Sequence, residues 1–204
     1  PSLGMPIADL ETRDVTMLIG SNLRKEQPLA ALRLRKSTRH GEVISVSPQD
    51  YDHNFKCAEE IIGTDWVQQL SGIAKALLSS GASVDAEVTS LLQNINATEQ
   101  QKRAADLLLK GEQKAVIVGA AALDHANAST VVALAQTIAQ LSGASFGALT
   151  HGANSAGAYL AGALPHRREA GHGSTAIGLN AQQMLTQGAK AFVLLDVEPE
   201  FDSQ

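Results

Sequence analysis

The sequence predicts an α/β fold of three layers, in which helices cover both faces of a mostly parallel sheet. Short β-branched and aliphatic runs alternate with alanine- and leucine-rich stretches of helical periodicity, the pattern of successive strand–helix–strand units. Of the 204 residues, 44% are hydrophobic and 18% are charged, which is typical of a folded chain and not of a disordered one.

Five runs are expected to form strands: 15–20, 42–47, 114–119, a weaker 144–149, and 191–196. Between the first two runs, Pro28 favours the first turn of a helix that Gly41 ends. Such a crossover is almost always right-handed. It therefore places the loop after the first strand at the carboxyl edge of the sheet, where open α/β sheets bind ligands.

Two further helices are expected, one over 64–78 with Thr64 as its N-cap and one that Thr98 opens and that ends before Gly111. The chain becomes richer in alanine and poorer in basic residues after Gly111. We therefore expect two lobes, 1–110 and 111–204.

The segment 151–178 is rich in glycine and is expected to be a long loop around a short helix over 155–161. Structureless stretches of that length are usually functional or ordered by a partner. The chain begins at Pro1, and its last strand-like run ends close to Gln204. We expect it to be an incomplete fragment of a longer subunit.

Charge and cysteine content exclude several classes of function. The 21 acidic and 16 basic residues give a formal net charge of -5, which argues against nucleic-acid binding. Cys57 is the single cysteine, so the chain has no internal disulfide and no cysteine-ligated zinc or iron–sulfur cluster of its own. No apolar run reaches the roughly 18 to 20 residues of a membrane span, and direct membrane insertion is not expected.

The loop Gly20-Ser21-Asn22 after the first strand has the parts of an anion or nucleotide site. The alternative is a tight turn in which Asn22 caps nearby backbone. The chain lacks both Gly-x-Gly-x-x-Gly and the P-loop motif, so ordinary dinucleotide and P-loop sites are not supported. His125, beyond the third strand, is placed for binding or simply starts the next helix.

Two other groups of residues have competing interpretations. The basic cluster comprises Arg24, Lys25, Arg33, Arg35, Lys36 and Arg39. A solvated helix face is the first interpretation of this cluster and a phosphate or partner patch is the second, with Arg24 and Lys25 the better ligand candidates. The spacing of His166, Glu169 and His172 suggests metal ligands, but residues six apart do not share a helix face, so a solvated loop is preferred.

Four segments, in this order, resemble the molybdopterin oxidoreductase family, and most closely its relative within the large iron–sulfur subunit of NADH:quinone oxidoreductase (respiratory complex I). The segments are 9–36, 114–125, 152–165 and 192–200. In catalytic members, the matching positions surround a bis-nucleotide pterin cofactor. The resemblance therefore implies two Rossmann-like lobes around a cofactor-shaped cleft at Gly20, Ser21, Asn22, Gly119, His125, Gly152, Asn154 and Glu198.

The resemblance also implies that this cleft is vestigial. The family usually has Asn or Asp where Glu198 stands, and a second carboxylate, Asp196, is close by. Two carboxylates beside a pyrophosphate are electrostatically unfavourable unless they are paired. In relatives, the side chain that ligates molybdenum lies upstream of Asp9. We therefore expect no catalytic residue, metal ligand or cofactor in this chain.

Three functions follow as hypotheses. The first is a scaffold in the electron-transfer arm of NADH:quinone oxidoreductase, where the parent subunit carries the iron–sulfur clusters and other subunits of the peripheral arm are the partners. Its place would be the cytoplasmic side of the inner membrane, or the matrix side in mitochondria. The second is part of a catalytic molybdenum- or tungsten-pterin oxidoreductase of the formate dehydrogenase or nitrate reductase type, with the pterin bound. The third is a free-standing nucleotide-binding module.

Overall fold

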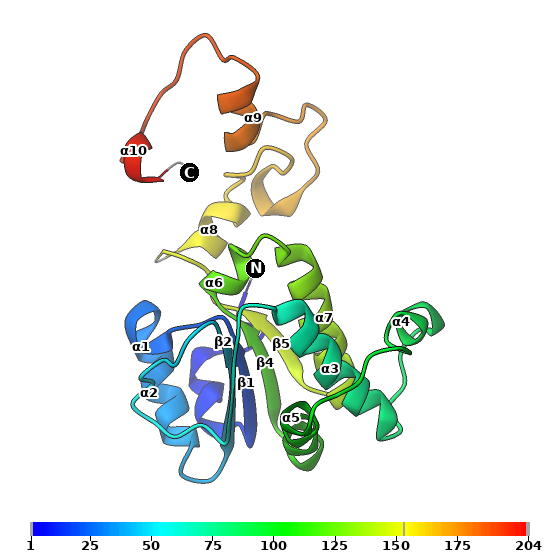
Figure 1. Cartoon of the computed structure of the whole chain (residues 1–204). Helices are drawn as coiled ribbons and strands as arrows, with labels where there is room; N and C mark the ends of the chain where they lie inside the picture. Colours follow the sequence, from blue (N-terminus) through cyan, green and yellow to red (C-terminus); the bar gives the residue numbers. More distant parts are fainter. Residues whose placement is uncertain (1, 153, 203–204) are drawn as a thin grey trace. The chain divides into compact units, whose positions relative to one another are not determined.

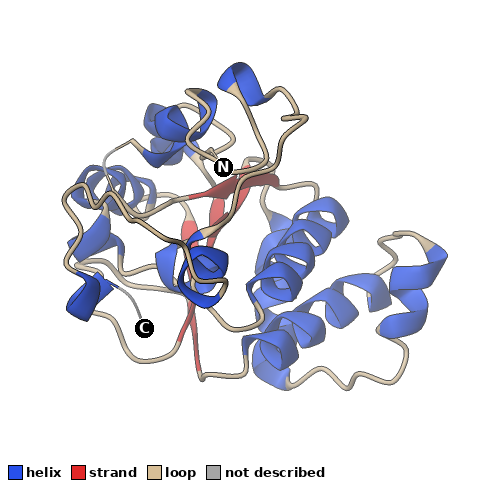
Figure 2. Cartoon of the chain, turned by 90° about the horizontal axis from the view of Figure 1, so that it is seen from above, coloured by secondary structure: helices blue, strands red, loops and turns tan. Residues whose placement is uncertain are grey.

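The computed structural model describes residues 2–152 and 154–202. The chain divides into a first unit, Pro1–Ala153, and a second unit, Asn154–Gln204. Five parallel strands form the sheet of the first unit, in the order β3-β2-β1-β4-β5 (Figure 1). They are β1 (Val15–Ile19), β2 (Glu42–Ser47), β3 (Glu59–Ile62), β4 (Lys114–Val118) and β5 (Ser145–Ala148). Helices cover both faces (Figure 2), so the predicted α/β class is confirmed.

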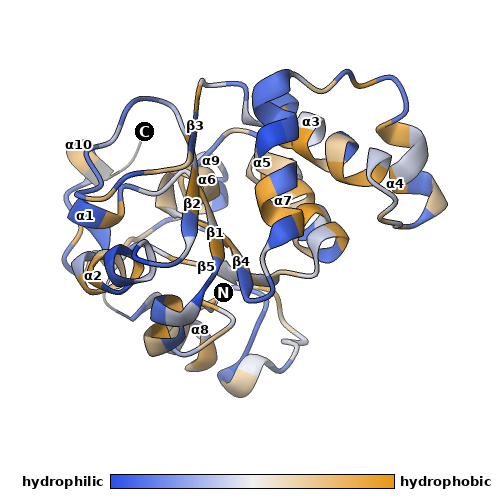
Figure 3. Ribbon diagram, turned by 90° about the horizontal axis from the view of Figure 1, so that it is seen from below, coloured by the Kyte–Doolittle hydropathy of each residue, from blue (hydrophilic) through white to orange (hydrophobic). Residues whose placement is uncertain are grey.

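The helical segments of the first unit, in chain order, are η1 (Ile7–Thr12), α1 (Leu23–Glu26), α2 (Pro28–Ser37), α3 (Trp66–Ser79), α4 (Ala86–Leu91), α5 (Glu99–Lys110), α6 (Ala120–Leu123) and α7 (Ala128–Ser142). Successive residues of β1 face opposite layers. Met17 and Ile19 join the core formed with α3, α5 and α7, whereas Leu18 joins the core formed with η1 and α2. Figure 3 shows the strands and α7 as largely hydrophobic.

The central strands are aligned in register, which fixes where their loops emerge. Ile19 lies opposite Val46 of β2 and opposite Val118 of β4. All five residues of β1 are buried, as expected for a strand that is paired on both sides and covered on both faces. The loops that follow β1, β2 and β4 therefore leave the sheet side by side at its carboxyl edge.

Capping chemistry confirms one predicted helix start and corrects another. Thr98 and Gln101 form a capping box at the start of α5, as expected from Thr98. The expected N-cap of α3, Thr64, is wrong by one residue. Asp65 is the N-cap because its carboxylate accepts a hydrogen bond of 3.0 Å from the backbone N–H of Gln68.

The boundary expected between residues 110 and 111 falls inside the first unit. β4 begins at Lys114 and pairs along its whole length with β1. Strands on both sides of Gly111 therefore share one sheet and both of its hydrophobic cores, and the chain divides after Ala153 instead. The change in composition near Gly111 does not coincide with this division.

β3 was not anticipated from the sequence. Its residues are Glu59, Glu60, Ile61 and Ile62, and only Ile61 is buried. Charged residues at a sheet edge discourage pairing with other chains but obscure the strand pattern.

The second unit contains α8 (Ser155–Leu160), η2 (Glu169–Gly171), α9 (Ala181–Thr186) and α10 (Pro199–Asp202). The short helix expected at 155–161 is confirmed. The strand expected over 191–196 is not formed: Val193 is 98% exposed and Leu195 is 87% exposed. A strand requires a partner strand for its backbone hydrogen bonds, and the described part of the second unit supplies none. Among the helices of residues 2–152 and 154–202, none combines the length and apolarity of a transmembrane span.

Candidate functional site

The carboxyl edge of the sheet has its topological switch point between β1 and β4. The chain moves outward from β1 through β2 to β3, and then returns to place β4 on the other side of β1. In open α/β sheets the loops at such a point diverge and leave a crevice for a ligand. Gly20 follows β1 and Gly119 follows β4, so two of the predicted site residues flank this point.

Here the two loops are in close contact at Gly20 and Gly119. A Cβ added to Gly119 would lie 2.3 Å from the Cβ of Ser21 and 2.6 Å from the carbonyl oxygen of Gly20. Gly20 adopts φ +61°, and a Cβ there would lie 2.7 Å from the backbone nitrogen of Ala122. Both glycines are therefore needed for the approach of one protein segment to another.

The backbone N–H groups of these loops donate to protein carbonyls. Gly20 donates to Val46 at 2.8 Å, and Gly119 donates to Ile19 at 2.7 Å. Ala121, in the first turn of α6, donates to the carbonyl of Gly20 at 3.1 Å. A phosphate-binding loop instead directs such N–H groups toward the anion. At these three positions the donors already have protein partners.

Trp66, the first residue of α3, closes the site from the side. A Cβ on Gly20 would lie 2.9 Å from the indole ring of Trp66, which is 3% exposed. The indole stacks on the ring of His125, with centroids 5.1 Å apart and planes 29° apart. The Nδ1 atom of His125 accepts a hydrogen bond of 3.0 Å from the backbone N–H of Asn127, which places the ring's proton on Nε2 when it is neutral.

Two polar atoms remain buried without a hydrogen-bond partner at this edge of the described structure. They are the Oγ of Ser21 and the Nε1 of Trp66. Asn22 is the N-cap residue of α1, and its carbonyl accepts from the N–H groups of Lys25 and Glu26, but its side chain makes no capping hydrogen bond. The expected capping by Asn22 is therefore wrong for its side chain, although Asn22 does occupy the N-cap position of α1.

The remaining predicted residues lie farther along the chain. Gly152 adopts φ +75° in the loop after β5, next to His151, whose Nε2 lies 2.5 Å from the Oδ2 of Asp124. Asn154 and Glu198 belong to the second unit. The side chain of Asn154 caps α8 by accepting from the N–H of Gly157 at 3.2 Å, and the carbonyl of Glu198 accepts from the N–H of Phe201 at 2.9 Å.

Trp66 and the Asp124–His151 pair were missed by the sequence analysis. Trp66 lies within the helix expected over 64–78, but its position at this edge depends on β3, which the sequence did not reveal. The available signal was topological, since each residue that follows a parallel strand reaches the same edge.

The switch point does not fit a pyrophosphate held on the loop after β1. The close approach that Gly20 permits is occupied by Ala122 and Trp66, and the N–H groups of Gly20 and Gly119 are bonded to neighbouring strands. The orphaned hydroxyl of Ser21 is enclosed, with Ser21 2% exposed. We therefore derive no chemical step through a pterin cofactor here.

The other candidate metal ligands and the single cysteine do not form a reactive site either. Within the described ranges, no three His, Cys, Asp or Glu side chains are arranged to hold a metal. Glu169 opens the short helix η2, and His166 lies before it in the turn between the bridged residues Leu164 and Arg167. Burial raises the pKa of the Cys57 thiol to about 12, with Glu60 as a further cause, so this thiol stays protonated and is a poor nucleophile.

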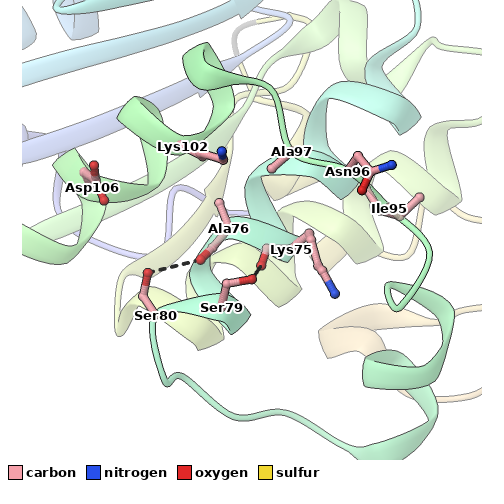
Figure 4. A pocket seen from close by; sticks show the side chains of 9 residues that line it. All are labelled: Lys75, Ala76, Ser79, Ser80, Ile95, Asn96, Ala97, Lys102 and Asp106. Carbon is pink, nitrogen blue, oxygen red and sulfur yellow. Dashed lines mark hydrogen bonds between the residues drawn. The ribbon is translucent and has the colours of Figure 1, made fainter.

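The hollow in Figure 4 lies away from the carboxyl edge, between α3, α5 and the segment 95–97. Its volume is about 380 Å³. Ser79 and Ser80 on its wall donate to the carbonyls of Lys75 and Ala76, at 2.9 and 3.1 Å. Lys102 bonds Glu99 at 2.7 Å. The hydroxyl groups of Ser79 and Ser80 and the ammonium group of Lys102 thus already have local partners.

Comparison with known proteins gives the family. The family description "Molybdopterin oxidoreductase" matches residues 1–204. The chain belongs to the molybdopterin oxidoreductase family. A search of curated proteins found no match.

One solved structure, the formyltransferase/hydrolase complex of Methylorubrum extorquens with methylofuran, has a similar chain at 13% identity and a TM-score of 0.46. The match covers 82% of this chain and 46% of the other, so this member of the molybdopterin oxidoreductase family spans about half the length of that chain.

Proposed function

We propose that this chain is a scaffold domain of the large iron–sulfur subunit of NADH:quinone oxidoreductase and binds no pterin itself. In this role it belongs to an oxidoreductase without catalysing a step. It would surround the redox centres of the parent subunit with protein, and it would dock other subunits of the peripheral arm at the membrane surface. Exclusion of solvent tunes cluster potentials and limits stray oxidation.

The closed switch point is the observation that supports this proposal. Family membership implies a cofactor-shaped cleft, yet the Gly20 and Gly119 loops are in contact where a nucleotide would enter. A site that evolved to hold a nucleotide would keep donors available for its phosphates. Here those donors complete the sheet, which favours an architectural role.

Cofactor analysis of the intact parent protein tests the proposal. We expect iron and sulfide but no stoichiometric molybdenum or tungsten, and no fluorescence of an oxidised pterin after acid extraction. A known pterin oxidoreductase treated in parallel is the positive control. Stoichiometric metal with pterin would refute the scaffold role.

Stoichiometric metal with pterin would instead support the alternative function, in which the chain is part of a catalytic molybdenum- or tungsten-pterin oxidoreductase. Family membership favours this alternative, because the family description names the pterin. Titration with guanine and adenine nucleotides tests the third hypothesis, a free-standing nucleotide module. Saturable micromolar binding to the 204-residue chain would count against the scaffold role.

A further inference from the structure

The basic cluster that the sequence analysis identified divides into paired and unpaired side chains. Arg33 and Lys36 both contact the carboxylate of Glu11, the latter at 2.8 Å, and Arg24 pairs with Asp52. Arg35 and Arg39 are exposed, and no described residue forms an ion pair with either. Lys25, in α1, also has no ion pair among the described residues, whereas Arg35 lies in the last turn of α2 and Arg39 just after it.

These unpaired arginines line two neighbouring hollows between α2 and the segment 53–58, which runs beside α2 in Figure 1. The first hollow, of about 290 Å³, is bordered by Arg24, Leu32, Arg35 and His53. The second, of about 590 Å³, starts one helical turn later and is bordered by Arg39, Glu42 and Lys56. We call the two together the α2 groove.

The α2 groove is cationic although the chain as a whole carries a net charge of -5. Arg35, Arg39 and Lys56 have no ion-pair partner among the described residues. Glu42 is the carboxylate on its wall, and the charges of Glu60, Asp50 and Asp52 act on His53 from outside the lining. Among the residues that line the two hollows, the cations Arg24, Arg35, Arg39 and Lys56 outnumber the carboxylate of Glu42, which favours an anionic occupant.

One aromatic ring on the wall of the groove, that of His53, is buried. His53 is 4% exposed and stacks on Phe55 at 5.3 Å, with Tyr51 at its edge. The Nδ1 atom of His53 is buried and has no hydrogen-bond partner in the described structure. Single-stranded nucleic acids require exposed aromatic faces for stacking, and the ring of His53 is buried against Phe55 instead.

Apolar side chains on α2 add a second kind of contact. Leu32, which borders the first hollow, is 50% exposed, and Leu29 is 70% exposed one turn earlier. Arginine forks match carboxylates, and exposed leucines match apolar side chains. Together they suit a polypeptide that alternates acidic and apolar residues.

We propose that the α2 groove binds an acidic, extended segment of a partner polypeptide. Carboxylates of that segment pair with Arg35 and Arg39, and its apolar side chains cover Leu32. This inference rests on the proposed scaffold role, which supplies the reason for a partner subunit at this surface. It adds to that role the chemistry of the partner.

A binding titration tests the groove. The probe is a fluorescent peptide of alternating Glu and Leu residues, and its fluorescence polarisation is followed on adding the 204-residue chain at low salt. We expect saturable binding that salt weakens, and a loss of about tenfold for Arg35→Glu. Lys110→Glu is the matched control. Lys110 also lies in the last turn of a helix, α5, and its substitution makes the same change in charge.

Three outcomes would overturn the groove as a peptide site: no saturable binding, an equal loss for Lys110→Glu and Arg35→Glu, or tighter binding of oligothymidylate than of the peptide. Circular dichroism of both variants confirms that each is folded. The result is independent of the cofactor analysis. Molybdenum in the parent protein would refute the scaffold role without changing the titration, and a failed titration would leave the cofactor result intact.

Discussion

The two units of this chain follow the same local rules but differ in what they bury. Thr98 and Gln101 form a capping box at α5 in the first unit, and Asn180 and Gln183 form one at α9 in the second. α5 then buries Leu108 against the sheet, whereas no described side chain of the second unit is buried. Caps and turns thus specify local conformation, but a core requires complementary faces from distant parts of the chain.

Hydrogen exchange should show the largest contrast between the units. Amides of β1 and β4 exchange only on global unfolding, and those of α9 on local opening that requires little free energy. For a global stability of about 5 kcal/mol, the protection factors should differ by about 10³- to 10⁴-fold. Exchange mass spectrometry of the intact chain measures this. Equal protection of β4 and α9 would mean that the second unit has its own core.

A pair of leucine truncations compares the units energetically. Leu70 is fully buried, at 0% exposure, and Leu195 is 87% exposed. We expect Leu70→Ala to lower the free energy of unfolding by about 2 to 5 kcal/mol, because it leaves a cavity between α3 and the sheet. Leu195→Ala should change it by less than about 0.5 kcal/mol. Urea denaturation checks both, and similar losses would contradict the comparison.

A pair of glycine substitutions tests the closed switch point. Gly119→Ala forces a Cβ against Ser21 at 2.3 Å and should reduce stability by about 1 to 3 kcal/mol. Gly173→Ala, in the second unit, places its Cβ where no atom lies within 4 Å and is the control. Thermal unfolding compares the two variants. An unchanged Tm for Gly119→Ala would show that the two loops are free to separate.

The smallest effect concerns pH. Burial holds the pKa of His53 below its ordinary 6.5. As pH falls below 6.5, the unfolded chain binds a proton that the folded chain resists, so stability declines until the pH passes the folded pKa. His53→Phe removes this titration and should flatten the stability profile between pH 6.5 and about 5. Urea titrations at each pH measure it.

The carboxyl groups of Glu11 and Asp14 provide an internal control for the pH dependence of stability. Hydrogen bonds from Lys36 and Arg33 lower the pKa of Glu11, and backbone N–H groups of Gln113 and Glu112 lower that of Asp14. These groups destabilise the fold only at more acidic pH, where the carboxylates are protonated. Both proteins should therefore decline in parallel below pH 4.5, the ordinary value for Glu11. Parallel profiles above that pH as well would refute the role of His53.

The local pattern determined four of the five expected strands, the helix that begins at Pro28 and the helix that Thr98 opens. Periodicity and caps act within a few residues, so they can be read along the chain. Only the tertiary structure decided that β4 joins β1, that β3 forms at the edge and that Trp66 closes over Gly20. It also left 191–196 without a partner strand. Strand pairing and loop contact join residues far apart in sequence, and their free energy depends on surfaces that exist only after folding.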